Sequence, residues 1–438
     1  MSSKTFRSLD LYSEEDCEYG LIEKNDLERS FATESPYAIM GSGRSLVGAY
    51  FGKGVRVLQQ PNEPPMIELD RQARLLRVSA SATVCQVYNF LIDNHYILTG
   101  LPSYPGVTIG GCVAANVHGQ NHYREGCFVE NIIDLTIYHP DFGQGIISRT
   151  SDKELFDLTV GGFGLTGIII QVTVRVVPVH TDLLNVSLRR FNSLEQGYEM
   201  LMLDKEDYDY FHGWVDLANL NPNVEKGFYL RAKFRSEPRF SGKVVRREKS
   251  KHTHLAWKLN VFGGPLLKTI NKIYSSSINL RLNRQATIGD FIFPSKNKLW
   301  YFSMFGREGI IEHQVLIPHS SVRSYILQLK QVLIEKKPFM SLCHMKLFKG
   351  RKKLLNFDGD GLCLAIHFKT NQCSLGVLEK LDHINVEHDC ITNIIKDSRV
   401  PPIILKAQYS QYDEFLSGIR KYDPNKTFEN TISQRLFL

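Results

Sequence analysis

The stretch GLPSYPGVTIGGCVAANVHGQNH, residues 100–122, decides the fold. Its glycines and alanines leave almost no side-chain bulk, with Gly106, Gly110 and Gly111 followed by Ala114 and Ala115. A backbone without bulky side chains lets a large flat ligand lie directly against it. The alternative is tight packing of helices or strands, and this stretch alone does not separate the two.

Two histidines in this stretch, His118 and His122, stand four residues apart, as in a helical zinc pair. Gly119 and Asn121 weaken a helix here, and no glutamate lies between the histidines. We therefore expect no metal at this pair.

Two more glycine-rich loops flank the stretch. GSGRSLVG, residues 41–48, follows the apolar PYAIM, and its amide hydrogens and the Ser45 hydroxyl are suited to hold phosphate oxygens. Its spacing is neither that of a Rossmann fingerprint nor that of a Walker loop. VGGFGLTGIII, residues 160–170, places three glycines in four positions before an apolar strand. Each loop alone is also explained by a turn or a helix end, but the three in this order indicate a ligand site.

The chain from about residue 38 to 179 alternates short apolar runs with turns, which predicts an α+β half. RLLRVSA and IIDLTIYHP are typical of strands, and TVCQVYNFLIDN is typical of an amphipathic helix. Ser151 and Glu154 form a capping-box pattern for a further short helix.

Longer strands follow from about residue 180. They are predicted at DYFHGWVDL, FYLRAKF, LWYFSMF, IEHQVLIP and LCLAIHF, with helices at SLEQGYEMLML and SVRSYILQLKQVLIEKK. This pattern predicts an antiparallel sheet with helices on one face, which is a second domain. Residues 241–283 lack a sustained period and are expected to form a mobile insertion.

Composition narrows the function classes. A chain of 438 residues is long enough for two cores, and 43% hydrophobic content without a run of ~18 apolar residues is that of a folded protein that does not span a bilayer. The N-terminus lacks a signal-peptide pattern, so we expect a cytoplasmic protein. Eight cysteines without a CxxC pair fit reduced thiols. The net charge of +7 alone suggests a nucleic-acid-binding protein, but no recognition motif supports that alternative, and we expect no nucleic-acid partner.

The three glycine-rich segments together resemble the FAD domain of the vanillyl-alcohol-oxidase type. HGWVDL, IEHQVLIP, HMKLFKG, LCLAIHF and IIKDSR extend a likeness to the decaprenylphosphoryl-β-D-ribose 2-oxidase family through the second half. The resemblance implies a two-domain α+β flavoprotein, an FAD-dependent oxidoreductase acting on CH–OH donors. It implies an FAD-binding domain at 1–179, an antiparallel-sheet substrate domain at 180–390, and a segment at 391–438 that returns to the FAD domain.

The resemblance also assigns residues. Relatives that bind FAD covalently often carry histidine where this chain has Arg44-Ser45, so FAD is expected to be noncovalent. The cofactor-binding residues that it implies are Gly41, Gly43, Arg44, Ser45, Gly106, Thr108, Gly110, Gly111, Ala115, His118, Gly164 and Ile168. The substrate-binding residues that it implies are Trp214, Gln314, Lys346 and Lys396.

Three departures from the family pattern bear on the substrate and not on the flavin. The family's His-Gly-Lys is His118-Gly119-Gln120 here, and its tyrosine after the first Arg-Ser is Leu46. Its Asn-x-Cys in the substrate domain is Cys363-x-Ala365.

Oxidation of a secondary alcohol needs a C–H bond directed at the flavin and a group that handles the hydroxyl proton. Our hypothesis gives Lys396, together with His118, this catalytic role, and a lysine used in this way needs a pKa lowered by burial. Lys346 and Gln314 would orient the sugar or its phosphate. The alternative for both lysines is simple solvation at the surface.

The expected product is a keto sugar, which a partner reductase converts further to complete an epimerisation. An aldonolactone is the alternative substrate, although the His-Trp-Gly-Lys-like element of aldonolactone oxidases is not found near the C-terminus.

A basic run, RFSGKVVRREKSKHTHLAWK, leads into the apolar LNVFGGPLLKTI. For a lipid-linked sugar substrate, residues 239–273 are therefore expected to make a peripheral contact with an anionic membrane surface. The alternative is an ordinary charged insertion.

Overall fold

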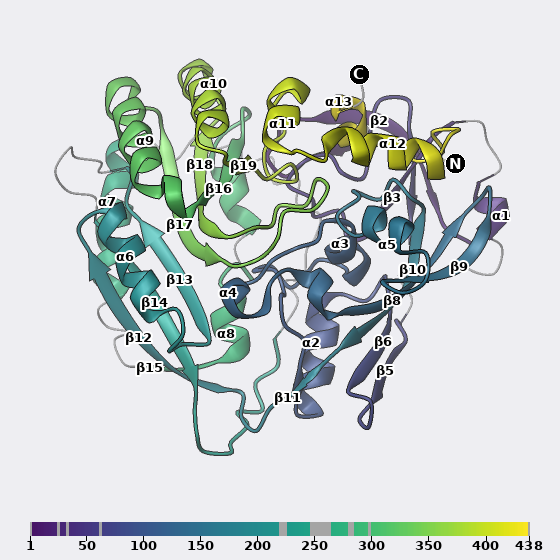
Figure 1. Ribbon diagram of the computed structural model, residues 1–438, viewed down its shortest axis with the longest axis horizontal. Helices are drawn as coiled ribbons and strands as arrows, with labels where there is room; N and C mark the ends of the chain where they lie inside the picture. Colours follow the sequence, from purple (N-terminus) through teal and green to yellow (C-terminus); the bar gives the residue numbers. More distant parts are fainter. Residues whose placement is uncertain are drawn as a thin grey trace.

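The computed structural model describes residues 2–23, 27–31, 35–60, 64–218, 226–245, 264–278, 284–296 and 299–436. Small sheets built from the first 178 residues form one half of the molecule, and a large sheet forms the other (Figure 1). No helix within these ranges is long and apolar enough to cross a membrane.

The first half contains a four-stranded sheet in the order β1-β2-β4-β3, a five-stranded sheet in the order β5-β6-β10-β8-β9, and the pair β11-β7. Its strands are β1 (Ser2–Arg7), β2 (Glu14–Leu21), β3 (Tyr37–Met40), β4 (Arg56–Gln59), β5 (Ile67–Asp70), β6 (Leu75–Ser79), β7 (Tyr96–Ile97), β8 (Ile132–His139), β9 (Gly143–Ser148), β10 (Ile168–Arg175) and β11 (Val177–Pro178). Its helices are α1 (Leu27–Ser30), α2 (Val84–Asp93), α3 (Ile109–Ala114), α4 (His122–Glu125), η1 (Phe128–Asn131) and α5 (Lys153–Thr159).

The predicted amphipathic helix is α2, and it begins with a complete capping box. Thr83 Oγ1 accepts the N–H of Gln86 at 3.3 Å, and Gln86 Oε1 accepts the N–H of Thr83 at 2.9 Å. Val84, Val87 and Leu91 recur at helical spacing and are buried against the five-stranded sheet.

The capping box predicted at Ser151 and Glu154 is wrong. The residue that caps α5 is Asp152, which adopts a left-handed φ of 51° and makes no side-chain capping hydrogen bond. Ser151 instead donates its N–H to Ser148 Oγ at 3.0 Å, because a local turn at the end of β9 binds it.

The second half is built on an eight-stranded antiparallel sheet in the order β15-β12-β14-β13-β17-β18-β16-β19. Together with the mixed first half, it confirms the α+β fold. Its strands are β12 (Leu183–Phe191), β13 (Tyr210–Val215), β14 (Gly227–Phe234), β15 (Arg284–Thr287), β16 (Ile310–Pro318), β17 (Met340–Phe348), β18 (Gly361–Lys369) and β19 (Ile391–Thr392). Its helices are α6 (Leu194–Asp204), α7 (Gly264–Ser277), α8 (Ile288–Ile292), η3 (Leu299–Met304), η4 (His319–Ser321), α9 (Val322–Lys336) and α10 (Gln372–Glu387).

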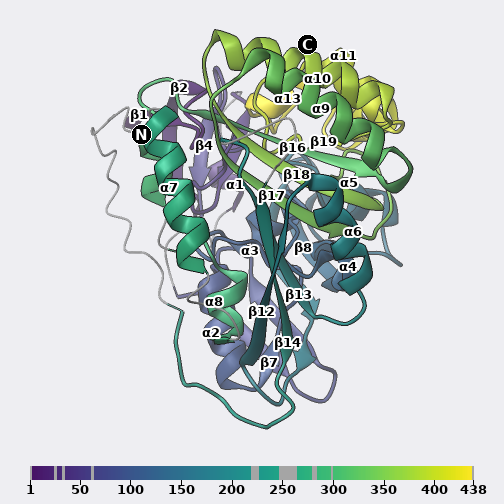
Figure 2. The ribbon, with the colours of Figure 1, turned by 90° about the vertical axis from the view of Figure 1, so that its left-hand side faces the viewer.

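Helices lie on both faces of this sheet and not on one face alone. Apolar side chains of α6, α9 and α10 share a core with one face of the sheet. Helix α7 lies on the opposite side of the sheet from α6 and α9 (Figure 2).

Helix α7 also corrects the expected mobile insertion, of which residues 246–263 and 279–283 lie outside the described ranges. Leu267, Asn271, Tyr274 and Ile278 recur at helical spacing on its inner face. The period is hidden in the sequence because one buried position is polar: Asn271 donates its Nδ2 to Asp216 Oδ1 at 2.8 Å.

The strand predicted at LWYFSMF is wrong as well, since these residues form the 3₁₀ helix η3. Tyr301 packs edge-on against Phe305, with ring centroids 5.1 Å apart, in a cluster that includes Leu267 of α7. Tertiary packing of the aromatic rings outweighs their preference for strands.

Of the C-terminal helices, α12 (Tyr412–Tyr422) and α13 (Thr431–Leu436) lie beside the N-terminal sheet (Figure 1), and α11 (Pro402–Gln408) packs against α10 and β19. Thr431 Oγ1 donates to the carbonyl of Gly48 at 2.6 Å, and Asn430 Nδ2 donates to the carbonyl of Phe163 at 2.9 Å. These contacts tie the end of the chain to the first and third glycine-rich loops.

Candidate active site

The first two glycine-rich loops meet at the start of α3. Gly41 lies so close to Thr108 that a Cβ on the glycine would stand 2.3 Å from the threonine Oγ1. The same Oγ1 caps α3 by accepting the N–H of Gly111 at 3.2 Å. Gly43 has a φ of +62°, which a side chain would strain. Glycine at these positions is therefore required for the loops to touch.

The third loop joins them through backbone hydrogen bonds. Gly161 donates its N–H to the carbonyl of Val113, and Phe163 donates to that of Ala114, both at 2.9 Å. Gly164 has a φ of +78°, and a Cβ there would meet no atom within 4 Å. These contacts bring the three loops together around α3, as a shared FAD site requires.

His118 follows α3 and lies between aromatic rings of the second half. Its ring centroid is 4.8 Å from that of Phe348 and 6.0 Å from that of Phe357. Burial, followed by the nearby charges of Lys346 and Lys396, lowers the pKa of His118 well below its ordinary value of 6.5. The imidazole is therefore neutral at neutral pH.

Gln314 and Lys346 reach the same place from the large sheet. Gln314 on β16 stands opposite Ala365 on β18, and Lys346 on β17 stands opposite Cys363. Since residues two apart in a strand share a face, all four side chains point to one side of the sheet. Gln314 Nε2 lies 3.3 Å from His118 Nε2 and 3.5 Å from Cys363 Sγ. The structure thus brings together residues from both halves of the chain.

The two lysines differ in their surroundings. Burial is the main cause that lowers the pKa of Lys346 below its ordinary value of 10.5, and the positive charge of Lys396 adds to it. Lys396 follows β19, and its Nζ lies 3.4 Å from Glu312 Oε2 with the side chain 33% exposed. The lowered lysine pKa that the hypothesis requires is therefore found at Lys346, whereas Lys396 is ion-paired.

Polar residues that the sequence did not single out surround this pair. Glu312 Oε2 also lies 3.2 Å from His367 Nε2, and the hydroxyl of Tyr301 lies 3.0 Å from His367 Nδ1. His344 donates its Nδ1–H to the carbonyl of Gly213 at 3.1 Å, and burial together with the charge of Lys346 lowers its pKa to about 4. The sequence contains a pattern that could have identified two of these residues. Glu312 stands two residues before Gln314, and His344 stands two residues before Lys346, so each pair lies on the same face of its strand.

Trp214 does not join the lysines. It lies on β13 among aromatic rings, with centroids 5.3 Å from both Phe228 and Tyr274. Trp214 stands opposite His344 and so shares the face of the sheet that carries Lys346, but its indole is buried beneath α7 and packs beside the site.

The departures from the family pattern lie close by. Gln120 takes the place of the family's lysine, and its Nε2 lies 3.1 Å from Ser103 Oγ and 3.3 Å from His212 Nδ1. Leu46, in the tyrosine position, is buried in the first loop. The site therefore lacks one cation and one hydroxyl that the family pattern provides.

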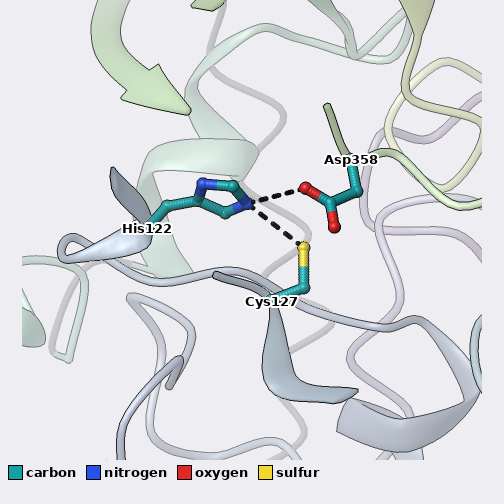
Figure 3. Close-up of side chains that lie close together, drawn as sticks. All are labelled: His122, Cys127 and Asp358. Atoms are coloured by element: carbon teal, nitrogen blue, oxygen red, sulfur yellow. Dashed lines mark hydrogen bonds and ion pairs between the residues drawn. The ribbon is translucent and has the colours of Figure 1, made fainter. Parts of the chain in front are cut away.

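A second buried cluster, of His122, Cys127 and Asp358, ties the two halves together (Figure 3). The ring centroid of His122 lies 6.2 Å from that of His118. His122 Nε2 lies 3.1 Å from Asp358 Oδ1 and 3.3 Å from Cys127 Sγ. His122 Nδ1 accepts the N–H of Lys349 at 3.3 Å, so Nε2 carries the proton and donates to the aspartate. Burial raises the pKa of the Cys127 thiol well above its ordinary range. These hydrogen bonds tie the FAD-binding half to the large sheet.

Comparison with known proteins agrees with this geometry. The profile of the FAD binding domain family matches residues 30–143, which contain the first two loops and His118. The chain is an FAD-dependent oxidoreductase.

Its likeness to individual proteins extends further. It is 22% identical over 410 residues to the decaprenylphosphoryl-beta-D-ribose oxidase of Mycolicibacterium smegmatis, covering 91% of this chain and 88% of the relative. It is 37% identical over 95 residues to the mitochondrial D-lactate dehydrogenase 1 (cytochrome) of Saccharomyces cerevisiae, covering 20% and 16% of the two chains. It is 24% identical over 147 residues to the mitochondrial L-galactono-1,4-lactone dehydrogenase of Arabidopsis thaliana, covering 34% and 24%.

Proposed function

We propose that the protein oxidises a secondary hydroxyl of a polyprenyl-phosphate-linked pentose to a keto sugar. The observation that carries this proposal is the meeting of His118 from the FAD-binding half with Gln314, Lys346 and Lys396 from the large sheet. The M. smegmatis relative, named for a lipid-linked ribose, supports it because the likeness covers both halves of the chain.

FAD, when bound, supplies the acceptor for the hydride that leaves the sugar carbon. Lys396, an ammonium paired with the carboxylate of Glu312, donates a hydrogen bond to the sugar oxygen and stabilises the negative charge that develops there as the hydroxyl proton passes to solvent. His118 holds the Gln314 side chain in place through the contact between their nitrogens. Lys346 and Gln314 hold the sugar or its phosphate, which fixes the C–H bond in a reactive orientation.

Oxidation of an aldonolactone is the second candidate. The match to a lactone dehydrogenase favours it, but that match covers only 34% of this chain. The polyprenyl-phosphate substrate has the wider support, since its relative aligns with 91% of the chain.

Two partners follow from this function. The keto sugar would be passed to a partner reductase that completes an epimerisation. The lipid chain would be reached by a peripheral membrane contact, and the described part of the predicted segment offers an exposed apolar row on α7. This row consists of Leu266, Ile270 and Ile273, which are 44%, 38% and 63% exposed.

An anaerobic assay separates the two substrate classes. The FAD-loaded protein is mixed with a panel of polyprenyl-phosphate pentoses and, separately, with free aldonolactones, and bleaching of the oxidised flavin is followed. We expect bleaching by a polyprenyl-phosphate pentose and none by the lactones. Bleaching by the lactones alone would replace the proposed substrate with the second candidate.

A further inference from the structure

Two buried amide side chains connect the backbone to His118. Asn393 follows β19, and its Oδ1 accepts the N–H of Ile395 at 3.2 Å. A backbone N–H can only donate, so this atom of Asn393 is the carbonyl oxygen, and the other is the NH₂ group. That NH₂ group donates to Gln314 Oε1 at 2.6 Å. The orientation of Asn393 therefore fixes the orientation of Gln314.

The orientation of Gln314 in turn fixes the proton on His118. With Oε1 accepting from Asn393, Gln314 presents its NH₂ group to His118 Nε2 at 3.3 Å. An NH₂ group has only hydrogens to offer, so Nε2 must accept with its lone pair. A neutral imidazole that accepts at Nε2 carries its proton on Nδ1.

The Nδ1–H of His118 is buried and has no hydrogen-bond partner among the residues that the structure describes. We infer that Asn393 and Gln314 hold His118 as the Nδ1–H tautomer. Because Gln314 occupies the Nε2 lone pair and protein atoms cover Nδ1, His118 does not take the hydroxyl proton. Asn393 is a positioning residue that acts on His118 through Gln314.

The consequence for catalysis rests on the proposed function, but the tautomer is measured without substrate. NMR of the FAD-loaded protein with ¹⁵N-labelled histidine distinguishes Nδ1–H from Nε2–H, and His118→Asn identifies the signal. We expect Nδ1–H in the wild type.

Two isosteric variants test the chain of amides. Asn393→Asp keeps an acceptor for Ile395 but loses the donor to Gln314, so the Gln314 amide turns and its oxygen faces His118. Gln314→Glu presents a carboxylate oxygen to the same ring nitrogen. Both are expected to move the proton to Nε2 and to slow substrate-dependent flavin reduction about tenfold to a hundredfold at unchanged FAD content.

Gln408→Glu is the matched control. Gln408 is a buried glutamine whose Oε1 accepts the N–H of Thr392 at 2.9 Å, and that bond survives the change. It is expected to leave the His118 signal as in the wild type. Nε2–H in the wild type, or an unchanged tautomer in both variants, overturns the inference. If the proton of His118 moves to Nε2 in these variants while the rate of flavin reduction stays unchanged, the tautomer assignment stands and only its proposed effect on catalysis is overturned.

Discussion

Glu312 Oε2 lies 3.4 Å from Lys396 Nζ and 3.2 Å from His367 Nε2. The carboxylate is buried, and burial alone would raise its pKa, but Lys396 and His367 outweigh burial and hold the pKa of Glu312 well below its ordinary value of 4.5. Glu312 is therefore ionised throughout the physiological range. It is the negative charge that balances the cluster of Lys346 and Lys396.

Neutralising this carboxylate is expected to disturb the site without unfolding the cofactor domain. Glu312→Gln should retain FAD and slow substrate-dependent flavin reduction about tenfold to a hundredfold, because Lys396 loses the group that fixes its Nζ. Single-turnover kinetics measures the change. Glu308→Gln is the control, since the Glu308 carboxylate lies 3.9 Å from Lys369 on the surface and such pairs contribute little. Equal rates in Glu312→Gln and the wild type would remove Glu312 from the reaction.

Lys396→Ala should leave the flavin content unchanged and slow flavin reduction by substrate about 10²- to 10⁴-fold, as expected for a cation that stabilises the charge developing on the sugar oxygen. Lys346→Ala is the informative companion, because burial lowers the pKa of Lys346. A loss below tenfold in Lys396→Ala, with a larger loss in Lys346→Ala, would transfer this role to Lys346.

FAD is expected to leave the protein on acid precipitation. The first loop carries Arg44 and Ser45 where covalent relatives have histidine, so no ring nitrogen is available there to bond the flavin. The yellow colour should appear in the supernatant and be measured by absorbance. Colour that stays with the pellet would contradict noncovalent binding.

The glycine-rich loops could be predicted from the sequence because glycine is required locally, as at Gly43 and Gly164 with their positive φ. The sequence also predicts strand β16, but it does not single out Glu312 as a site residue, although Glu312 shares a face with Gln314. The role of Glu312 depends on its contacts with Lys396 and His367, and these residues lie beside it only because of the order of the strands in the sheet. Such pairings across a sheet are not encoded in any local pattern.

The incorrect predictions at α7 and η3 also result from contacts between distant residues. The sequence does not predict helix α7 because Asn271, a buried polar residue that hydrogen-bonds to Asp216, interrupts the apolar period. The aromatic run of η3 has strand-forming residues, but its rings find a cluster in three dimensions that overrides this preference.

The free energy of unfolding is expected to depend on pH through Asp10, a buried carboxylate in the N-terminal segment. Asp10 accepts hydrogen bonds from Ser8, Ser398 and the N–H of Tyr12, but burial outweighs them and raises its pKa from 3.8 to about 6. The folded chain therefore binds more protons than the unfolded chain between about pH 4 and 6. The contribution of Asp10 to the free energy of unfolding falls as pH rises through this window.

Asp10→Asn removes this titration while keeping an acceptor for Tyr12. Denaturant unfolding at several pH values from 4 to 7 should show a flatter pH dependence than in the wild type. The difference at pH 7 is expected to approach about 3 kcal/mol in favour of the variant, from about 1.4 kcal/mol per pKa unit. Asp93→Asn, at an exposed position on α2, should keep the wild-type slope. An Asp10→Asn slope equal to that of the wild type would show that Asp10 does not titrate in this window.

The proposed membrane contact requires basic residues that are attracted to anionic lipids and apolar residues that insert between the headgroups. On α7, the exposed Leu266, Ile270 and Ile273 follow helical spacing along one side of the exposed face, and the exposed Lys268 and Lys272 lie on the other side of this face. Each lysine near an anionic surface contributes roughly 1 kcal/mol, and the apolar row is suited to enter the headgroup region. The basic residues Arg246, Arg247, Lys249 and Lys251 lie outside the described residues, so α7 is the part of the segment on which the prediction can be argued from contacts and exposure.

We therefore expect the protein to float with vesicles that contain anionic lipid at low salt, and to float less at high salt because the charges are screened. Ile270→Ser with Ile273→Ser should reduce the floated fraction without changing FAD content. Leu203→Ser with Ile403→Ser is the matched control, since these apolar residues are 75% and 78% exposed but lie on α6 and α11, away from α7 (Figure 2). Serine at Arg246, Arg247, Lys249 and Lys251 should weaken flotation further. If the wild type and every variant float equally, α7 and the basic run do not bind the membrane, and a soluble substrate becomes the better explanation of the site.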